Sequence, residues 1–359
     1  MTDTGVYIHV PFCASKCPYC DFYSVRFNEA QEKIYMKALF SQMQKYGGIG
    51  IDTVYFGGGT PSLLGAEKIT EILNEVKKIF ILHTPEITVE CNPSTVDENF
   101  FEAIAKAGVN RISLGLQSAV DSERKKLGRK AGRKDVENAI TFAKKYGIKN
   151  ISLDLMLGIE NQTEESLKQS VDFCISSDVT HISAYILKLE EGTFFYKNRD
   201  KLNLPDEDAT CDLYLQACEL LENGGFYQYE ISNFAKLGYE SKHNLKYWNC
   251  EEYLGFGPAA HSFYNGKRFY FDREIVENPM PQEDGAGGDF NEYLMLKLRL
   301  TKGIENEEVI KKFGHPIPDK IIKKAAFFER KGFMKTDENS ISLTRQGFLI
   351  SNYIISELV

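Results

Sequence analysis

The chain has 359 residues, of which 43% are hydrophobic and 26% are charged, and its formal net charge is −8. A negative balance disfavours nonspecific binding to nucleic-acid phosphates. No stretch approaches the ~18 consecutive apolar residues of a membrane span, and the N-terminus lacks the basic and apolar segments of a signal peptide. The sequence therefore predicts a cytoplasmic protein with room for one large and one smaller domain.

Strands and helices alternate over roughly the first 224 residues. Each expected strand is a short apolar run, and each is followed by a segment with the apolar periodicity of a helix. Strands are expected at residues 6–10, 53–56, 87–91, 111–116, 151–156 and 181–187, with helices at about 28–46, 69–80, 97–108, 136–147, from 163, and 206–223. Such alternation indicates parallel strands and an α/β fold. Six units predict a partial (β/α)6 barrel, with a doubly wound sheet as the alternative.

Three cysteines follow the first expected strand with the spacing C-x3-C-x2-C: Cys13, Cys17 and Cys20. Three thiolates on one tight loop suit an iron–sulfur cluster, and the missing fourth ligand leaves one iron open. Structural zinc usually takes four closed ligands, often in two pairs. The loop has no second pair, although His9 could in principle complete a zinc site. A disulfide is disfavoured in a cytosolic protein.

The other five cysteines lack compact ligand spacing. Two helical segments carry cysteine at apolar positions i, i+4 and i+7, which is the pattern of a buried helix face. Because free cysteine is among the most buried residue types, we interpret all five as core residues: Cys91, Cys174, Cys211, Cys218 and Cys250.

Polar residues stand at or near the ends of three expected strands, at Glu90, Gln117 and Asp154. In a parallel barrel the functional site lies at the carboxyl ends of the strands. Burying these groups costs free energy unless each finds a partner, which a polar cofactor or neighbouring protein groups can supply. The turn Gly57–Pro61 (Gly-Gly-Gly-Thr-Pro) also allows close backbone approach to a ligand.

The cysteine loop, with Tyr19 before its last cysteine, resembles the signature of the radical S-adenosylmethionine (SAM) enzymes. The string Tyr7–Cys13 is similar to the branch around oxygen-independent coproporphyrinogen III oxidase. That oxidase carries a further cysteine two residues past the third, where this chain has Phe22. The variant resembles the haem chaperones of the same branch.

The resemblance implies a [4Fe-4S] cluster on the three cysteines and SAM bound beside it. A reduced cluster passes an electron to SAM, and homolysis gives methionine and a 5′-deoxyadenosyl radical, while the protein positions and shields these groups. The positions that match SAM contacts are Tyr7, Tyr19, Gly58, Gly59, Thr60, Glu90, Gln117, Arg129 and Asp154. Arg129 suits a carboxylate because its guanidinium is planar and permanently charged.

A histidine among aromatic residues lies beyond the expected barrel, between residues 238 and 265. His243, Asn244, Tyr247 and Trp248 form H-N-x-x-Y-W, which resembles the motif tied to haem binding in those chaperones. Histidine is a common axial ligand of haem iron, so His243 is the predicted haem residue and His261 a secondary candidate. A packed polar histidine is the alternative for both.

The last part of the chain follows an expected linker at 279–289, which is rich in proline and glycine. Helices near 290–300, 305–313 and 317–331, two short strands and a final helix indicate a smaller α+β, winged-helix-like domain. From Phe290 onward 12 lysines and arginines face 9 acidic residues, a surplus of 3, so a structural or partner-docking role is favoured over DNA binding. We expect domains at 1–230, 231–288 and 289–359.

Three classes of function remain open from the sequence. The leading hypothesis is a radical SAM haem chaperone that delivers haem to an acceptor protein, which can be membrane-associated, with a low-potential electron donor and no nucleic acid. The second is oxidative decarboxylation of coproporphyrinogen III propionates to vinyl groups. The third is a binding module whose cluster only stabilises the fold.

Overall fold

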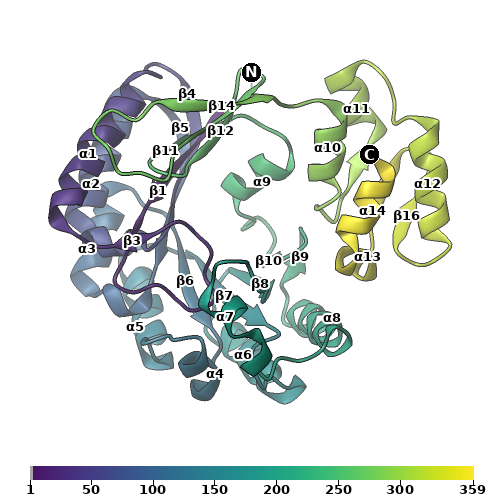
Figure 1. Cartoon of the computed structure of the whole chain (residues 1–359), viewed down its shortest axis with the longest axis horizontal. Helices are drawn as coiled ribbons and strands as arrows, with labels where there is room; N and C mark the ends of the chain where they lie inside the picture. Colours follow the sequence, from purple (N-terminus) through teal and green to yellow (C-terminus); the bar gives the residue numbers. More distant parts are fainter. Residues whose placement is uncertain (1–2) are drawn as a thin grey trace.

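The computed structural model describes residues 3–359, and its largest element is a curved 12-stranded sheet (Figure 1). The central strands are parallel. In spatial order they are β11 (Tyr253–Phe256), β1 (Thr4–Val10), β4 (Gly50–Gly58), β5 (Ile81–Cys91), β6 (Arg111–Gln117), β7 (Asn150–Leu157) and β8 (His181–Ile186). Within the described residues the sheet ends at two unpaired outer strands, so the barrel is open. The partial (β/α)6 barrel is confirmed, and β11 adds a parallel strand that was not predicted.

Helices cover the outer face of this sheet (Figure 1). They are α1 (Glu29–Gln44), α2 (Gly65–Ile79), α3 (Glu98–Ala107), α5 (Arg133–Lys145), α6 (Glu164–Ser176) and α8 (Glu207–Asn223). The expected boundaries of α3 are confirmed, because the Asp97 side chain accepts a hydrogen bond from Phe100 N and Gly108 ends the helix at φ 103°. None of the helices within residues 3–359 combines the length and apolar character needed to span a bilayer.

The inner face of the sheet is polar, and the candidate site lies on this face. Successive side chains of a strand point to opposite faces, so alternate residues enter the barrel. The register between β5 and β6 puts these inward-facing residues side by side, because Thr88 pairs with Arg111 and Glu90 with Ser113. The same alternation brings Asp154 of β7 to this interior. The outward-facing residues between them are apolar and form the core with the helices.

Antiparallel strands extend both ends of the sheet. On the β8 side these are β10 (Asn233–Ala235) and β9 (Tyr227–Gln228), and on the β11 side β12 (His261–Tyr264), β13 (Lys267–Phe271) and β14 (Pro281–Ala286). The prediction of a linker at 279–289 was therefore wrong for Pro281–Ala286, which pair with β13. Their side chains are all exposed, so no apolar alternation marked this strand in the sequence.

Short elements surround the strand ends. They are β2 (Phe12–Cys13), β3 (Val25–Arg26), η1 (Pro61–Leu64), η2 (Pro93–Thr95), α4 (Asp121–Lys126), α7 (Phe194–Lys197), η3 (Arg199–Lys201) and α9 (Lys242–Trp248). In Figure 1 α9 lies at the open side of the curved sheet, facing the C-terminal region.

The C-terminal region forms a separate small cluster of helices with a three-stranded sheet, β15–β17–β16 (Figure 1). Its elements are α10 (Phe290–Lys297), β15 (Ile304–Glu305), α11 (Asn306–Phe313), α12 (Asp319–Glu329), β16 (Met334–Thr336), β17 (Ser340–Leu343), α13 (Arg345–Leu349) and α14 (Ser351–Leu358). The winged-helix-like fold is confirmed. The expected final helix is two helices, with the break at Ile350.

The cysteines outside the loop are mostly core residues, as expected. Cys91, Cys174, Cys218 and Cys250 are buried. Cys211 is only half-buried on α8, so its assignment to the core was wrong, because it lies on the first turns of the helix, where the packed face is incomplete.

Candidate functional site

A pocket of about 470 Å³ opens at the carboxyl ends of the parallel strands. Eleven of the predicted site residues line it: Cys13, Cys17, Tyr19, Cys20, Gly58, Gly59, Thr60, Glu90, Gln117, Arg129 and Asp154. Tyr7 and His243 do not. The structure therefore brings residues from the first loop, four strand ends and one connecting loop to a single place, as the parallel topology predicts.

The Gly-Gly-Gly-Thr-Pro turn holds the start of the cysteine loop. Gly59 N donates to Val10 O at 2.8 Å, and Thr60 N donates to Phe12 O at 2.8 Å. A Cβ on Gly59 would lie 2.7 Å from Phe12 O, closer than atoms can pack, so only glycine fits here. Thr60 Oγ1 also lies 3.4 Å from Cys13 Sγ. The turn thus fixes the first cysteine at the pocket wall.

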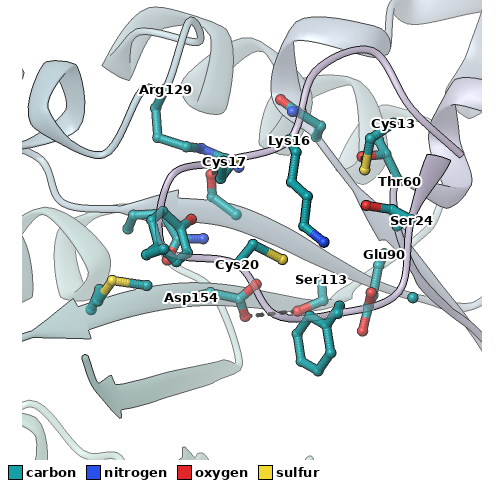
Figure 2. A pocket seen from close by; sticks show the side chains of 18 of the residues that line it. Cys13, Lys16, Cys17, Cys20, Ser24, Thr60, Glu90, Ser113, Arg129 and Asp154 are labelled. Atoms are coloured by element: carbon teal, nitrogen blue, oxygen red, sulfur yellow. Dashed lines mark hydrogen bonds between the residues drawn. The ribbon is translucent and has the colours of Figure 1, made fainter. Parts of the chain in front are cut away.

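The three cysteines are spread around the pocket (Figure 2). Cys13 lies beside Thr60, Cys17 beside Arg129, and the Lys16 side chain reaches into the space between them. All three thiols are free and partly exposed. Burial raises the pKa of the Cys20 thiol.

Two carboxylates face each other across the pocket floor. The Tyr55 hydroxyl donates to Glu90 Oε1 at 2.8 Å. The Ser113 hydroxyl donates to Asp154 Oδ1 at 2.9 Å (Figure 2). Burial, with a contribution from the Asp154 charge, raises the pKa of Glu90 to about 7. Burial also raises the pKa of Asp154. Such paired, enclosed carboxylates suit a ligand that supplies positive charge or hydroxyl donors.

Arg129 reaches the pocket from the loop between α4 and α5. Its guanidinium donates from Nη2 to Gly115 O at 2.8 Å and from Nη1 toward Cys17 Sγ at 3.9 Å. A Cβ on Gly115 would lie 2.7 Å from Arg129 Nη2, so this glycine leaves the room that the guanidinium fills.

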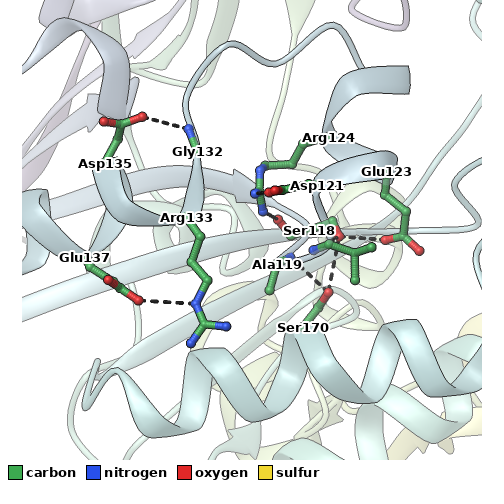
Figure 3. A network of polar contacts seen from close by, with 11 residues as sticks. Ser118, Ala119, Asp121, Glu123, Arg124, Gly132, Arg133, Asp135, Glu137 and Ser170 are labelled. Atoms are coloured by element: carbon green, nitrogen blue, oxygen red, sulfur yellow. Dashed lines mark hydrogen bonds and ion pairs between the residues drawn. The ribbon is translucent and has the colours of Figure 1, made fainter.

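A polar network fixes the loop that carries Arg129 (Figure 3). The Ser118 hydroxyl donates to Glu123 Oε2 at 2.6 Å, and Arg124 Nη1 donates to Ser118 O at 2.7 Å. Arg124 also pairs with Asp121. Because Arg129 N donates to Arg124 O at 2.9 Å, the network sets the position of the residue at the pocket.

Three predicted residues lie behind the pocket wall. Tyr7 stacks on Tyr55, and its hydroxyl is 3.1 Å from His9 Nδ1. His9 Nε2 is 3.0 Å from Tyr23 O, so both nitrogens of His9 have partners and the ring is not free to complete a zinc site. Both nitrogens of His243 are also engaged, with Thr53 Oγ1 at 2.8 Å and the Tyr247 hydroxyl at 2.8 Å.

His243 is fully buried, and burial lowers its pKa to about 3 with help from the nearby Lys246 and Arg111 charges. It is therefore neutral at physiological pH. His261, the secondary candidate, is exposed on β12 and stacks on Tyr270, away from the pocket lining.

Comparison with known proteins agrees with this geometry. The radical SAM superfamily profile matches residues 7–174, and the HemN C-terminal domain profile matches residues 289–350. A Bacillus subtilis protein named "Heme chaperone HemW" is 34% identical over 98% of this chain and 97% of its own length. The chain belongs to the HemW family of radical SAM proteins. A second HemW, from Haemophilus influenzae, is 40% identical over 98% of this chain and 96% of its own length.

The chain also has the same fold as a solved structure. The coproporphyrinogen III oxidase HemN from Escherichia coli superposes with a TM-score of 0.83 over 99% of this chain and 89% of that chain, at 18% identity. At this identity the match establishes the fold alone. It covers both the open barrel and the C-terminal region.

Membership of the radical SAM superfamily implies a [4Fe-4S] cluster and SAM, and the residues present fit both. Three free thiols on one loop match the donor set that such clusters use. The enclosed carboxylates Glu90 and Asp154 and the guanidinium of Arg129 offer opposite charges to an amino acid ligand. A bound, reduced cluster supplies the electron for reductive cleavage of SAM. In this HemW-family chain the pocket residues would hold and orient that pair.

Several lining residues were missed by the sequence interpretation. Arg111 and Ser113 stand on β6 at even spacings before Gln117, so a strand periodicity of two could have identified them. Asn244 lines the pocket in place of its neighbour His243. No local signal distinguishes these two, because the choice depends on how α9 packs.

Proposed function

We propose that this protein is a radical SAM haem chaperone, in which Cys13, Cys17 and Cys20 hold a [4Fe-4S] cluster and the surrounding pocket binds SAM. One observation carries the proposal. The pocket that contains the three cysteines is also lined by Asn244 of the H-N-x-x-Y-W motif. The relatives named as heme chaperones over nearly the full chain support the same assignment.

In this proposal nine residues bind or position SAM: Tyr7, Tyr19, Gly58, Gly59, Thr60, Glu90, Gln117, Arg129 and Asp154. Arg129 would pair with the carboxylate of SAM, and Glu90 with its amino group, since opposite charges strengthen such hydrogen bonds. Tyr7 would act from behind by packing on Tyr55.

Phe22 favours haem handling over porphyrin oxidation. Its side chain is 64% exposed and lines the pocket at the position where the resembling oxidase has a cysteine. An exposed phenyl ring offers an apolar surface to a flat, apolar ligand. Oxidative decarboxylation of coproporphyrinogen III stays the second candidate, because the string Tyr7–Cys13 resembles the branch of that oxidase.

The role of His243 as an axial ligand stays a prediction. Its two nitrogens bond to Thr53 and Tyr247, so binding iron would require one of these bonds to open. His243→Ala tests this directly. Full stoichiometric haem on the variant would remove His243 from the haem site and leave it a packing role.

The deciding experiment measures two products in one anaerobic sample of the reconstituted full-length protein with SAM, a low-potential reductant and either haem or coproporphyrinogen III. Stoichiometric haem without vinyl product supports the chaperone. Protoporphyrinogen formation supports the oxidase. Release of 5′-deoxyadenosine in either case excludes a cluster that only stabilises the fold. Transfer of the bound haem to an acceptor protein then tests delivery.

A further inference from the structure

The barrel interior contains a buried cation with unused hydrogen-bonding capacity. Arg111 begins β6, is 2% exposed and lines the pocket. Among residues 3–359, its Nε and Nη1 have no hydrogen-bond partner. The Oγ1 of Thr88, which pairs with Arg111 across β5 and β6, is buried and also lacks a partner. Buried polar groups are nearly always bonded to protein, water or ligand, so this cluster can take a polar partner from the pocket.

The neighbouring polar groups are committed elsewhere. The Tyr55 hydroxyl bonds to Glu90, and the Ser113 hydroxyl bonds to Asp154. Glu86 Oε1 accepts from His243 N at 3.3 Å. These carboxylates place negative charge around Arg111 without bonding to its Nε or Nη1. The guanidinium therefore keeps donors that no protein group uses, and its charge and planar shape suit a carboxylate.

Asn244 adds a second polar group at the same end of the pocket. It comes from α9 and lines the pocket with Arg111. Its backbone N–H bonds to Ser241 Oγ, whereas no bond of its side-chain amide is found within the described chain. Arg111 precedes Gln117 by six residues, which places it about 20 Å nearer the amino end of β6. His243, the neighbour of Asn244, bonds through its N–H to Glu86 of β5, two residues before the Thr88 that pairs with Arg111. Arg111 and Asn244 therefore both belong to the inner end of the pocket.

The outer part of the pocket adds two apolar side chains. Phe22 and Ile186 line it beside charged residues of the same loops, and they are 64% and 40% exposed. A ligand that contacts Phe22 and Arg111 beside the bound cluster and SAM would combine an apolar body with a carboxylate at one edge. The haem of the proposed function has this character, because its macrocycle is apolar and its two propionates are charged.

We infer that Arg111 and Asn244 form a carboxylate-binding subsite that takes a haem propionate at the inner end of the pocket. This inference rests on the proposed function and adds the group by which the ligand is recognised. Arg111 donates from its guanidinium to the carboxylate oxygens, and the Asn244 amide donates from the α9 side. The propionate is bound without chemical change.

The test compares haem with haem dimethyl ester, which has the same macrocycle but no free carboxylate. Titrations use the full-length reconstituted protein under anaerobic conditions at one pH. The native protein should bind haem at least about tenfold more tightly than the ester, the preference typical of a hydrogen-bonded charge. Arg111→Gln should abolish this preference. Lys134→Gln removes an equal charge from a side chain that is 79% exposed on α5, and it should keep the preference.

Because Arg111 is buried, a second variant guards against misfolding. Asn244→Asp is isosteric at a partly exposed position and puts a negative charge beside the subsite, so it should also abolish the preference. Equal binding of haem and ester by the native protein, or a preference that persists in both variants, would overturn the inference alone. Failure of the native protein to bind either compound would overturn both the inference and the proposed haem function.

Discussion

Glu90→Gln is expected to make the ligand-free protein more stable above neutral pH and, at the same time, to weaken SAM binding. Glu90 lies in the pocket floor, where it accepts a hydrogen bond from Tyr55 at 2.8 Å and faces Asp154. Glutamine has nearly the same shape and can accept the same bond through its carbonyl oxygen. The substitution therefore removes only the charge.

The magnitude follows from the pKa of Glu90. Burial, with Asp154, raises it from 4.5 to about 7. Between these values the unfolded chain has lost the proton that the folded chain keeps, so the free energy of unfolding falls as pH rises and the loss is complete above pH 7. A pKa difference of about 2.5 corresponds to an upper value of about 3 kcal/mol. Glu90 touches the open pocket, and solvent screening reduces this to about 1–3 kcal/mol.

The assay is urea unfolding of the ligand-free protein and the variant from pH 4.5 to 8.5. The variant should exceed the native protein by about 1–3 kcal/mol at pH 8 and by almost nothing near pH 4.5. Burial raises the pKa of Glu230 to about 7 as well, but that residue is present in both proteins and cancels in the difference. A difference that stays constant with pH would refute the reasoning.

The same substitution, Glu90→Gln, should raise stability but weaken SAM binding. Above pH 7 the ionised Glu90 attracts the amino group of SAM, whereas the variant offers only a neutral amide. We expect affinity for SAM to rise with pH through about 7 in the native protein and to stay level in the variant, with at least about a tenfold loss at pH 8. Unchanged affinity at pH 8 would remove Glu90 from the SAM site.

Three further substitutions test the rest of the site. Gly59→Ala forces a Cβ against the backbone of the cysteine loop, so it should lower the free energy of unfolding by about 1–3 kcal/mol and reduce bound iron. In the control Gly47→Ala the new Cβ would have no atom closer than 4.0 Å, so stability and bound iron should stay unchanged. Cys17→Ala should lose nearly all reconstituted iron while Cys211→Ala retains it; equal iron in both would exclude the cluster from the loop. Phe22→Ser should leave stability within about 0.5 kcal/mol but weaken haem binding measured by titration, and unchanged haem affinity would exclude Phe22 from the haem surface.

The parts of the site that could be predicted correctly depend on short-range sequence patterns. Cys13, Cys17 and Cys20 are within eight residues, and their spacing alone places them on one loop. Glu90 and Asp154 could be placed because each follows an apolar run, and parallel strands bring their carboxyl ends to one edge. The β14 strand could not be predicted in the same way. Its residues are exposed on both faces, so nothing in their pattern distinguishes a strand from a linker.

The motif on α9 shows where sequence neighbours no longer suffice to predict which residue faces the pocket. Adjacent residues on a helix point about 100° apart, so His243 and Asn244 cannot both face the pocket. Contacts with residues 190 and 243 positions earlier decide which one does: His243 Nδ1 lies 2.8 Å from Thr53 Oγ1, and Lys246 Nζ donates to Asp3 O at 2.7 Å. These bonds turn His243 toward β4 and leave Asn244 on the pocket side. The motif thus identifies the correct helix, while long-range packing selects the residue that a ligand would meet.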